Sequence, residues 1–214
     1  MPLQRSQIEK CIHCGHAQAV DTFLSVNTAE NPELREKVRD GSLFLWECDA
    51  CGGKNLLRNN FLYHDPDRRL MVWLLGEGAV DEKQLLATAR ELPDYTLRRV
   101  GDVGSLIEKV NIFDAGLEDT VMEMCKWVSR QELAETMGDR RAQVLAAPFK
   151  FFRLEGADHE LVLSFPMGGQ MYSSRVGFNV YEDCRGILQR NPAAVEALDG
   201  FARVDAEWIE GMMR

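Results

Sequence analysis

Two cysteine pairs near the start of the chain decide how its first third folds: Cys11-Ile12-His13-Cys14-Gly15 and Cys48-Asp49-Ala50-Cys51-Gly52. Two residues between paired cysteines let both sulfurs reach one metal ion. A glycine after the second cysteine permits a left-handed turn that aims backbone amides at the sulfurs. Two such knuckles predict one tetrahedral metal site with four ligands, namely Cys11, Cys14, Cys48 and Cys51. Four thiolates leave no open coordination position, so the pattern indicates a structural rather than a catalytic metal.

The ligand set favours one zinc ion per chain. Iron in a rubredoxin-like site is the alternative, because tetrahedral sulfur ligation serves both metals. The first pair alone could be a redox motif, but such a motif opens a helix after a strand, whereas Gly15 follows here. His13 or His16 could replace one cysteine. The simpler interpretation leaves both histidines exposed beside four sulfur ligands.

The segments between and after the knuckles predict a small ribbon with one helix. Strands are expected at 20–26 and 42–47. Between them, Asn31 can cap a short helix, Pro32 suits its first position, and Gly41 can end it in a left-handed conformation. Segments 56–63 and 70–75 then flank His64-Asp65-Pro66-Asp67, so they predict a hairpin. Residues 70–75 are apolar at every position, which predicts that this arm is covered on both faces.

His64 and Asp65 could also serve acid–base chemistry, but a turn explains them more simply. We place a domain boundary after this hairpin, with a zinc-ribbon-like module at 1–78 and an α+β domain at 79–214. The overall fold class predicted is α+β: a zinc-ribbon-like N-terminal module followed by a mixed α/β body.

The second domain begins with two capping-box patterns, Asp81-x-x-Gln84 and Ser105-x-x-Glu108. A longer helix is expected over 117–128, with Glu118 and Asp119 favouring its start and Glu123 in solvent. The pattern then fades into a loop at 137–148. The remaining elements are two strands at 149–154 and 160–165 and two closing helices at 178–189 and 201–212. Cys125 and Cys184 fall in helical patterns and read as small core residues.

At this point the chain resembles a known family. The two cysteine pairs, Asn31-Pro32-Glu33-Leu34, Gly41, Leu62-Tyr63-His64-Asp65-Pro66, Ile107-Glu108-Lys109 and Leu117-Glu118-Asp119 are similar to the pattern of the bacterial and archaeal CpXC domain family. The resemblance covers residues 8–130. It implies a zinc-ribbon-like start followed by an α+β body, and it implies no activity. The family is named for a proline after the first cysteine of each pair, where this chain has Ile12 and Asp49.

Composition narrows the range of partners and compartments. The net charge is -9, and most of the excess acid lies in residues 61–140. An acidic surface repels phosphate backbones, so nucleic acid is not the expected partner. The longest apolar run, 70–75, is too short to span a bilayer, and the first ten residues show no signal-peptide pattern. These features, with paired cysteines kept as thiolates, predict a cytoplasmic protein.

Three hypotheses about function follow. The preferred one is a cytoplasmic protein with a structural Cys₄ zinc site that acts as a protein-interaction or regulatory module, binding another protein or itself. The second is a nucleic-acid-binding zinc-ribbon regulator. The third is an enzyme whose site lies in the C-terminal half and is not revealed by a sequence motif. No catalytic residue and no organic cofactor is assigned, because no Ser/His/Asp or HExxH constellation is visible.

Overall fold

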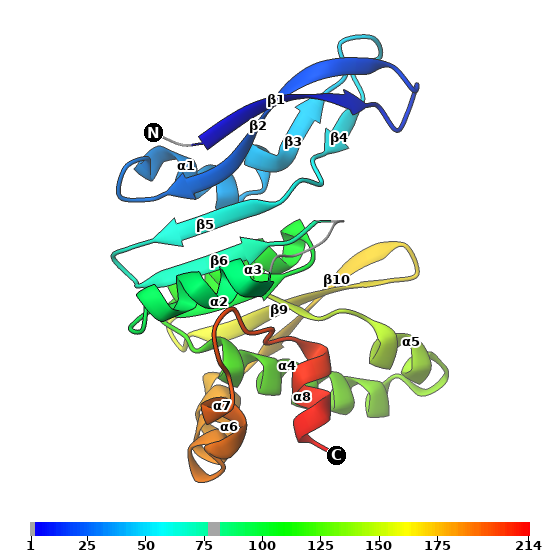
Figure 1. The fold of residues 1–214 in the computed structure, drawn as a ribbon. Coiled ribbons are helices and arrows are strands. Elements are labelled where there is room, and N and C mark those ends of the chain that lie inside the picture. The colour runs from blue at the N-terminus through cyan, green and yellow to red at the C-terminus, as the bar shows by residue number, and fades with distance from the viewer. Residues whose placement is uncertain (1–2, 77–81) are drawn as a thin grey trace. The chain divides into compact units, whose positions relative to one another are not determined.

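The computed structural model describes residues 3–76 and 82–214 of the chain (Figure 1). Their contacts divide the chain into two compact units. The first unit comprises Met1–Ile107 and Gly200–Ala202, and the second comprises Glu108–Asp199 and Arg203–Arg214. Both units combine helices with strands, which confirms the predicted α+β class.

The boundary predicted between residues 78 and 79 lies outside the described residues. The contact-based division falls within helix α3 (Val103–Asp114). The first unit includes β7 (Thr96–Val100), because this strand pairs in parallel with β6 (Leu70–Leu74).

A five-stranded sheet forms the frame of the first unit, in the order β1-β2-β5-β6-β7. Its other strands are β1 (Leu3–Lys10), β2 (Ala17–Asn27) and β5 (Phe61–Asp65). β1 pairs antiparallel with β2, β2 pairs parallel with β5, and β5 pairs antiparallel with β6. The predicted hairpin is therefore present as β5–β6. Four of the five β6 side chains are buried, as the continuous apolar pattern predicted.

A second, two-stranded sheet carries the ribbon. β3 (Leu45–Glu47) pairs antiparallel with β4 (Lys54–Leu56), so Leu56 belongs to the ribbon and not to the β5–β6 hairpin. The strand expected over 42–47 is shorter than predicted, because Ser42–Phe44 form a 3₁₀ turn. Helix α1 (Pro32–Arg39) begins at the expected proline, but the Asn31 side chain makes no capping hydrogen bond. Gly41 has the predicted left-handed conformation, with φ of 77°.

Helix α2 (Glu82–Glu91) adds a small apolar cluster to the first unit. Leu85 packs with Met71, Leu97 and Phe201, and the rings of Phe201 and Trp73 meet edge to face. Asp81, the first residue of the predicted capping box Asp81-x-x-Gln84, lies outside the described residues.

The second unit packs helices against a three-stranded antiparallel sheet (Figure 1). The strands, in the order β10-β9-β8, are β8 (Lys150–Glu155), β9 (Glu160–Met167) and β10 (Gln170–Val176). The helices are α4 (Asp119–Thr136), α5 (Arg141–Ala146), α6 (Phe178–Arg190), α7 (Ala193–Glu196) and α8 (Ala206–Met212). Helix α4 is central, since it contacts α5, α6, α8 and β8.

One apolar core fills this unit, and Cys125 and Cys184 are buried in it as predicted. Two predictions were wrong. The loop expected over 137–148 contains a 3₁₀ turn (Gly138–Arg140) and α5. The closing helix expected from residue 201 begins only at Ala206, where the Asp205 carboxylate accepts the Trp208 amide and caps it.

Helix α3 begins with a different cap from the one predicted. The Asp102 carboxylate accepts hydrogen bonds from the Ser105 backbone N–H at 2.8 Å and from its hydroxyl at 2.6 Å. Glu108, expected to complete a capping box with Ser105, is instead buried and accepts the Phe151 backbone N–H at 2.8 Å. The Ser105-x-x-Glu108 prediction was therefore wrong about the cap.

Glu108 belongs to a buried ionic cluster of the second unit. Lys126 Nζ lies 2.7 Å from both Glu108 Oε1 and Glu123 Oε1, and Lys109 Nζ lies 2.8 Å from Asp119 Oδ2. All five side chains are buried, so the expectation that Glu123 is in solvent was wrong. Burial raises the pKa of Glu123 despite the nearby Lys126 and Lys109. Burial alone would lower the pKa of Lys126, but Glu108 and Glu123 raise it.

Candidate metal centre

The two knuckles share one backbone geometry. In each, the amide of the glycine after the second cysteine donates to the carbonyl of the first cysteine, at 2.9 Å from Gly15 and 2.8 Å from Gly52. In each, the amide of the first cysteine donates to the carbonyl five residues later, at 2.8 Å in the first knuckle and 3.0 Å in the second. Gly15 and Gly52 have φ of 76° and 67°, which confirms the predicted left-handed turns.

The knuckles bring the four predicted sulfurs together. Cys11 Sγ lies 3.7 Å from Cys51 Sγ, and Cys14 Sγ lies 3.7 Å from Cys48 Sγ. All four sulfurs lie within 4.8 Å of one another. A tetrahedral ion with metal–sulfur bonds of about 2.3 Å separates its sulfurs by about 3.8 Å. The spacing therefore fits one metal ion, and the described residues contain no other comparable cluster of Cys, His, Asp and Glu.

Hydrogen bonds prepare one of these sulfurs to be a thiolate. Cys11 is buried, which alone would raise its pKa. The backbone amides of Cys14 and His13 and the side chain of Asn55 outweigh that effect and lower the pKa of Cys11 to about 6. At Cys51, the Gly53 amide works in the same direction, but the neighbouring sulfurs raise the pKa to about 12. Four thiols this close cannot all ionise without a cation, and the four sulfurs together could hold a metal ion.

The two nearby histidines are not placed as ligands. His13 Nε2 lies 3.0 Å from the Lys54 carbonyl, and His16 Nε2 lies 2.9 Å from Asp49 Oδ1. Both contacts run from the first knuckle to the segment of the second. The histidines thus connect the knuckles, and the grouped ligand atoms come from the four cysteines alone.

The position of the His13 ring also explains why a second glycine, Gly53, follows Gly52. A Cβ atom added at Gly53 would lie 2.5 Å from His13 Cδ2 and 3.2 Å from Cys51 Sγ. Both distances are too short for ordinary contact. The His13 ring can therefore reach Lys54 only because residue 53 has no side chain.

We expect Gly53→Ala to weaken metal binding, because overpacking costs about 1–3 kcal/mol and here displaces a ring held against the knuckle. A chelator competition titration measures the change. The double variant Gly53→Ala/His13→Ala should recover most of the affinity, and His13→Ala alone should retain its metal. Gly101→Ala is the matched control, since a Cβ there meets no atom within 4 Å. Unchanged affinity in Gly53→Ala would contradict the packing described here.

The other candidate residues have structural partners. Asp65 is buried and accepts the Arg68 backbone amide at 3.3 Å and its guanidinium at 3.1 Å, which confirms its role in the turn. His64 Nε2 lies 3.2 Å from the Tyr95 hydroxyl. Burial lowers the pKa of His64, although Asp65 and Glu30 act in the opposite direction.

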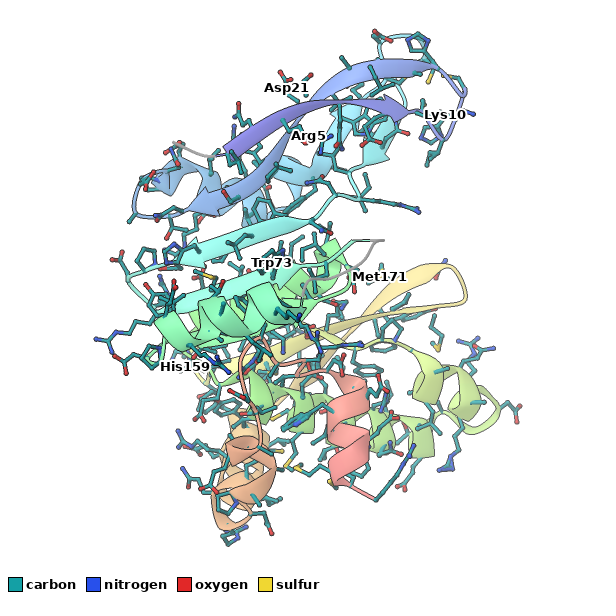
Figure 2. All side chains as sticks on the ribbon, in the orientation of Figure 1. Arg5, Lys10, Asp21, Trp73, His159 and Met171 are labelled. Atoms are coloured by element: carbon teal, nitrogen blue, oxygen red, sulfur yellow. The ribbon has the colours of Figure 1, made fainter. Side chains whose placement is uncertain are left out.

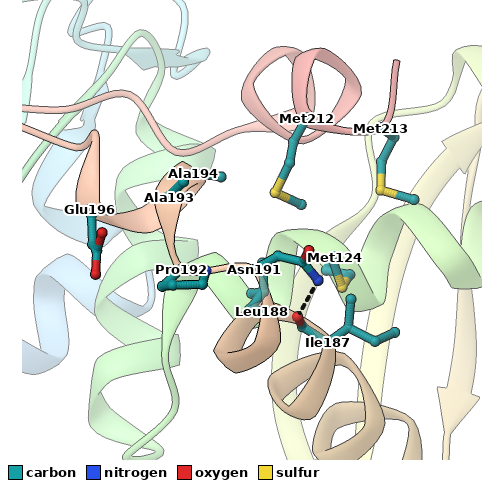
Figure 3. Close-up of a pocket in the computed structure, with 10 residues that line it drawn as sticks. All are labelled: Met124, Ile187, Leu188, Asn191, Pro192, Ala193, Ala194, Glu196, Met212 and Met213. Atoms are coloured by element: carbon teal, nitrogen blue, oxygen red, sulfur yellow. Dashed lines mark hydrogen bonds between the residues drawn. The ribbon is translucent and has the colours of Figure 1, made fainter.

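The second unit contains a cavity of about 510 Å³ between α4, α6, α7 and α8 (Figure 3). Its walls include the side chains of Met124, Leu188 and Met212. The side-chain amide of Asn191, one of the few polar groups of the cavity, donates a hydrogen bond to the Ile187 carbonyl at 2.9 Å. The lining residues offer no nucleophile beside a base, so this cavity does not support a catalytic site.

The model of the CpXC protein family matches residues 10–126, which is more than half of the chain. The chain belongs to the CpXC family. The matched region contains both knuckles and extends into α4. No curated protein and no solved structure matches the chain.

The two positions at which this CpXC protein lacks the proline of the family name are both amide donors. The Ile12 N–H donates to Asn55 Oδ1 at 2.9 Å, and the Asp49 N–H donates to Gln18 Oε1 at 2.9 Å. Each bond links one knuckle to the strand beside the other. A proline has no N–H and would remove either bond. The side chains of Asn55 and Gln18 therefore connect the two knuckles by hydrogen bonds. A proline at either position would instead stiffen its own knuckle through the pyrrolidine ring.

Sequence reasoning did not identify Asn55 or Gln18. Asn55 is buried in β4, where it also donates to Cys11 Sγ at 3.5 Å and to the Gly53 carbonyl at 2.8 Å. A weak signal was present, because a buried amide in a short strand after a knuckle must find hydrogen-bond partners.

Proposed function

We propose that this CpXC protein holds one structural zinc ion and uses its ribbon as a protein-interaction module in the cytoplasm. The closed set of four sulfur ligands supports a structural ion, because it leaves no position for a substrate. All six described cysteines are free thiols, which suits a reducing compartment. No helix in the described residues is both long and apolar enough to span a membrane.

The observation that carries the interaction role is an exposed apolar pair on the ribbon. Leu45 and Leu56 lie directly opposite each other on β3 and β4, and each is 48% exposed. Ile12 on the first knuckle is 77% exposed. Metal binding holds this small ribbon in shape without burying these side chains, and exposed apolar groups on a rigid element favour a protein partner.

The charges around the ribbon do not favour nucleic acid as that partner. On α1, the Arg39 guanidinium pairs with Glu36 at 2.9 Å, and in the ribbon Lys54 on β4 lies opposite Glu47 on β3. Basic groups that alternate with acids give no continuous positive face for phosphates. We therefore propose a protein rather than a nucleic acid.

We expect the purified protein to carry one zinc ion per chain after dialysis against metal-free buffer, because four thiolates bind zinc tightly. Atomic emission spectrometry measures the stoichiometry. Stoichiometric iron with a visible thiolate-to-iron charge-transfer band would instead establish the rubredoxin-like alternative.

Replacing the apolar pair should abolish partner binding without loss of metal. In cells that express Leu45→Asp/Leu56→Asp, quantitative cross-linking should recover about tenfold less of any protein captured by the wild type, because a buried charge in an interface is costly. The control is Leu86→Asp/Ile187→Asp, at positions that are 47% and 41% exposed. Equal recovery with both variants would contradict the proposal, provided that their zinc content is unchanged.

A further inference from the structure

Strand β1 is an open edge of the first unit's sheet. It pairs with β2 on one side, and in the order of the sheet no described strand lies on its other side. Its side chains are largely exposed, with Leu3 at 59% and Ile8 at 72%. An open edge presents a row of N–H and C=O groups to which another strand can pair.

The charges of β1 match those of a second copy of the same strand. Antiparallel self-pairing centred on Gln7 places Arg5 opposite Glu9 of the second copy, and the two-fold axis repeats this pair. The same register sets Ser6 opposite Ile8. Arg5 and Lys10 both lie along β1 (Figure 2). Within the described part of the chain, Arg5 forms no ion pair, and the Glu9 carboxylate accepts a hydrogen bond from Gln7 at 2.6 Å. Arg5 is therefore available to a partner.

Other registers are poorer. Outward-facing backbone groups alternate along a strand, so an antiparallel two-fold axis must pass through a residue and not between two residues. An axis at Ser6 places Arg5 opposite Gln7, and an axis at Ile8 places Glu9 opposite Gln7. Neither pairs opposite charges. The axis at Gln7 alone among the three does so, and it pairs the strand from Gln4 to Lys10.

We propose that two copies of the chain associate through β1, antiparallel about Gln7, so that their sheets join into one. Opposite charges directly across a strand pair stabilise it, and like charges there destabilise it. The same charges that keep the edge from pairing at random therefore specify one self-complementary register. The contact is a single strand pair, so the dimer is weak and depends on concentration.

Exchanging the charges of Arg5 and Glu9 tests the proposed register. Sedimentation equilibrium of the zinc-loaded wild type should show a monomer–dimer equilibrium. Arg5→Glu and Glu9→Arg should each weaken the dimer about tenfold or more, because each creates two facing like-charge pairs. The double variant Arg5→Glu/Glu9→Arg should restore the wild-type dissociation constant to within about threefold. The control is Arg58→Glu, which changes the net charge as Arg5→Glu does but at an exposed position just after β4. It should leave the monomer–dimer equilibrium unchanged.

Three results would overturn the proposal: a monomer at every concentration, a dimer that ignores both single changes, or single variants that the double variant does not rescue. Circular dichroism and zinc content show whether each variant is folded. The proposal does not depend on the Leu45–Leu56 pair. Leu45→Asp/Leu56→Asp should still dimerise, so failure of the ribbon proposal and failure of this one are distinguishable.

Discussion

Replacing Cys48 with serine is expected to unfold the ribbon while the second unit remains folded. Cys48 is 1% exposed and belongs to a five-residue apolar cluster with Cys11, Val20, Trp46 and Leu57. Two of the five members, Cys11 and Cys48, belong to the group of four sulfurs that could hold a metal ion. Structural zinc contributes about 10–16 kcal/mol to the folding of small ribbons, far more than the three remaining apolar side chains can.

Hydrogen exchange measured by mass spectrometry resolves this result along the chain. Protection should fall first over residues 8–20 and 42–58, and the helices α4 and α6 should keep theirs. Chelation of the wild type should reproduce the pattern. Cys184→Ala is the matched control, because Cys184 is equally buried (2%) but lies outside the metal centre. It should keep both the metal and the ribbon. Intact protection of the ribbon in Cys48→Ser would show that the metal is not needed for its folding.

Replacing Lys126 with methionine is expected to destabilise the second unit by about 3–5 kcal/mol, because it removes the shortest ion pair of each of two buried carboxylates. Lys109 remains 3.6 Å from Glu123 Oε1, and Lys150 remains 3.7 Å from Glu108 Oε2. Lys126 Nζ bridges Glu108 and Glu123 at 2.7 Å each. Methionine fills a similar volume, so the loss of charge pairing dominates. Urea denaturation measures the change in unfolding free energy.

Two comparisons isolate the charge effect in Lys126→Met. Arg39→Met removes one side of an exposed ion pair with Glu36 and should cost about 1 kcal/mol or less. The triple variant Lys126→Met/Glu108→Gln/Glu123→Gln should recover much of the loss, because it removes both buried charges. A cost for Lys126→Met as small as that for Arg39→Met would mean that the cluster contributes little.

The destabilisation by Lys126→Met should shrink as the pH falls from neutral to about 5. Burial raises the pKa of Glu123, and loss of the adjacent cation raises it further. A carboxyl group whose pKa is higher in the folded state binds its proton more tightly there. Protonation then favours folding, and the penalty present at higher pH is lost as the pH falls through the folded-state pKa. A gap between variant and wild type that does not change with pH would contradict this account.

The grouping of the four sulfurs was predictable because its information is local. Cys-x-x-Cys-Gly specifies the turn, the left-handed glycine and the direction of the sulfurs within five residues, and the structure has all three. The hairpin β5–β6 and the pair β8–β9 were predictable for the same reason, since turn residues separate short apolar runs.

The ionic cluster was not predictable in this way. The local sequence predicted that Glu108 completes a capping box and that Glu123 faces solvent. Both predictions were wrong. The burial of these two residues depends on Lys126 meeting both carboxylates, which is a property of packing and not of spacing along the chain. β1 and β10 were missed for a related reason, because largely exposed strands lack the apolar alternation that marks a half-buried one.

The two knuckles, whose hydrogen bonds cross from one to the other, leave the ribosome at different times. A ribosome adds about 5–20 residues per second, so Cys51 follows Cys11 after about 2–8 s. During this interval the first two thiols have neither their partner sulfurs nor the Asn55 side chain that stabilises a thiolate at Cys11. The nascent chain therefore passes through a stage with an unprotected dithiol. That dithiol stays open to oxidation until Cys48, Cys51 and Asn55 have emerged and the four sulfurs can come together.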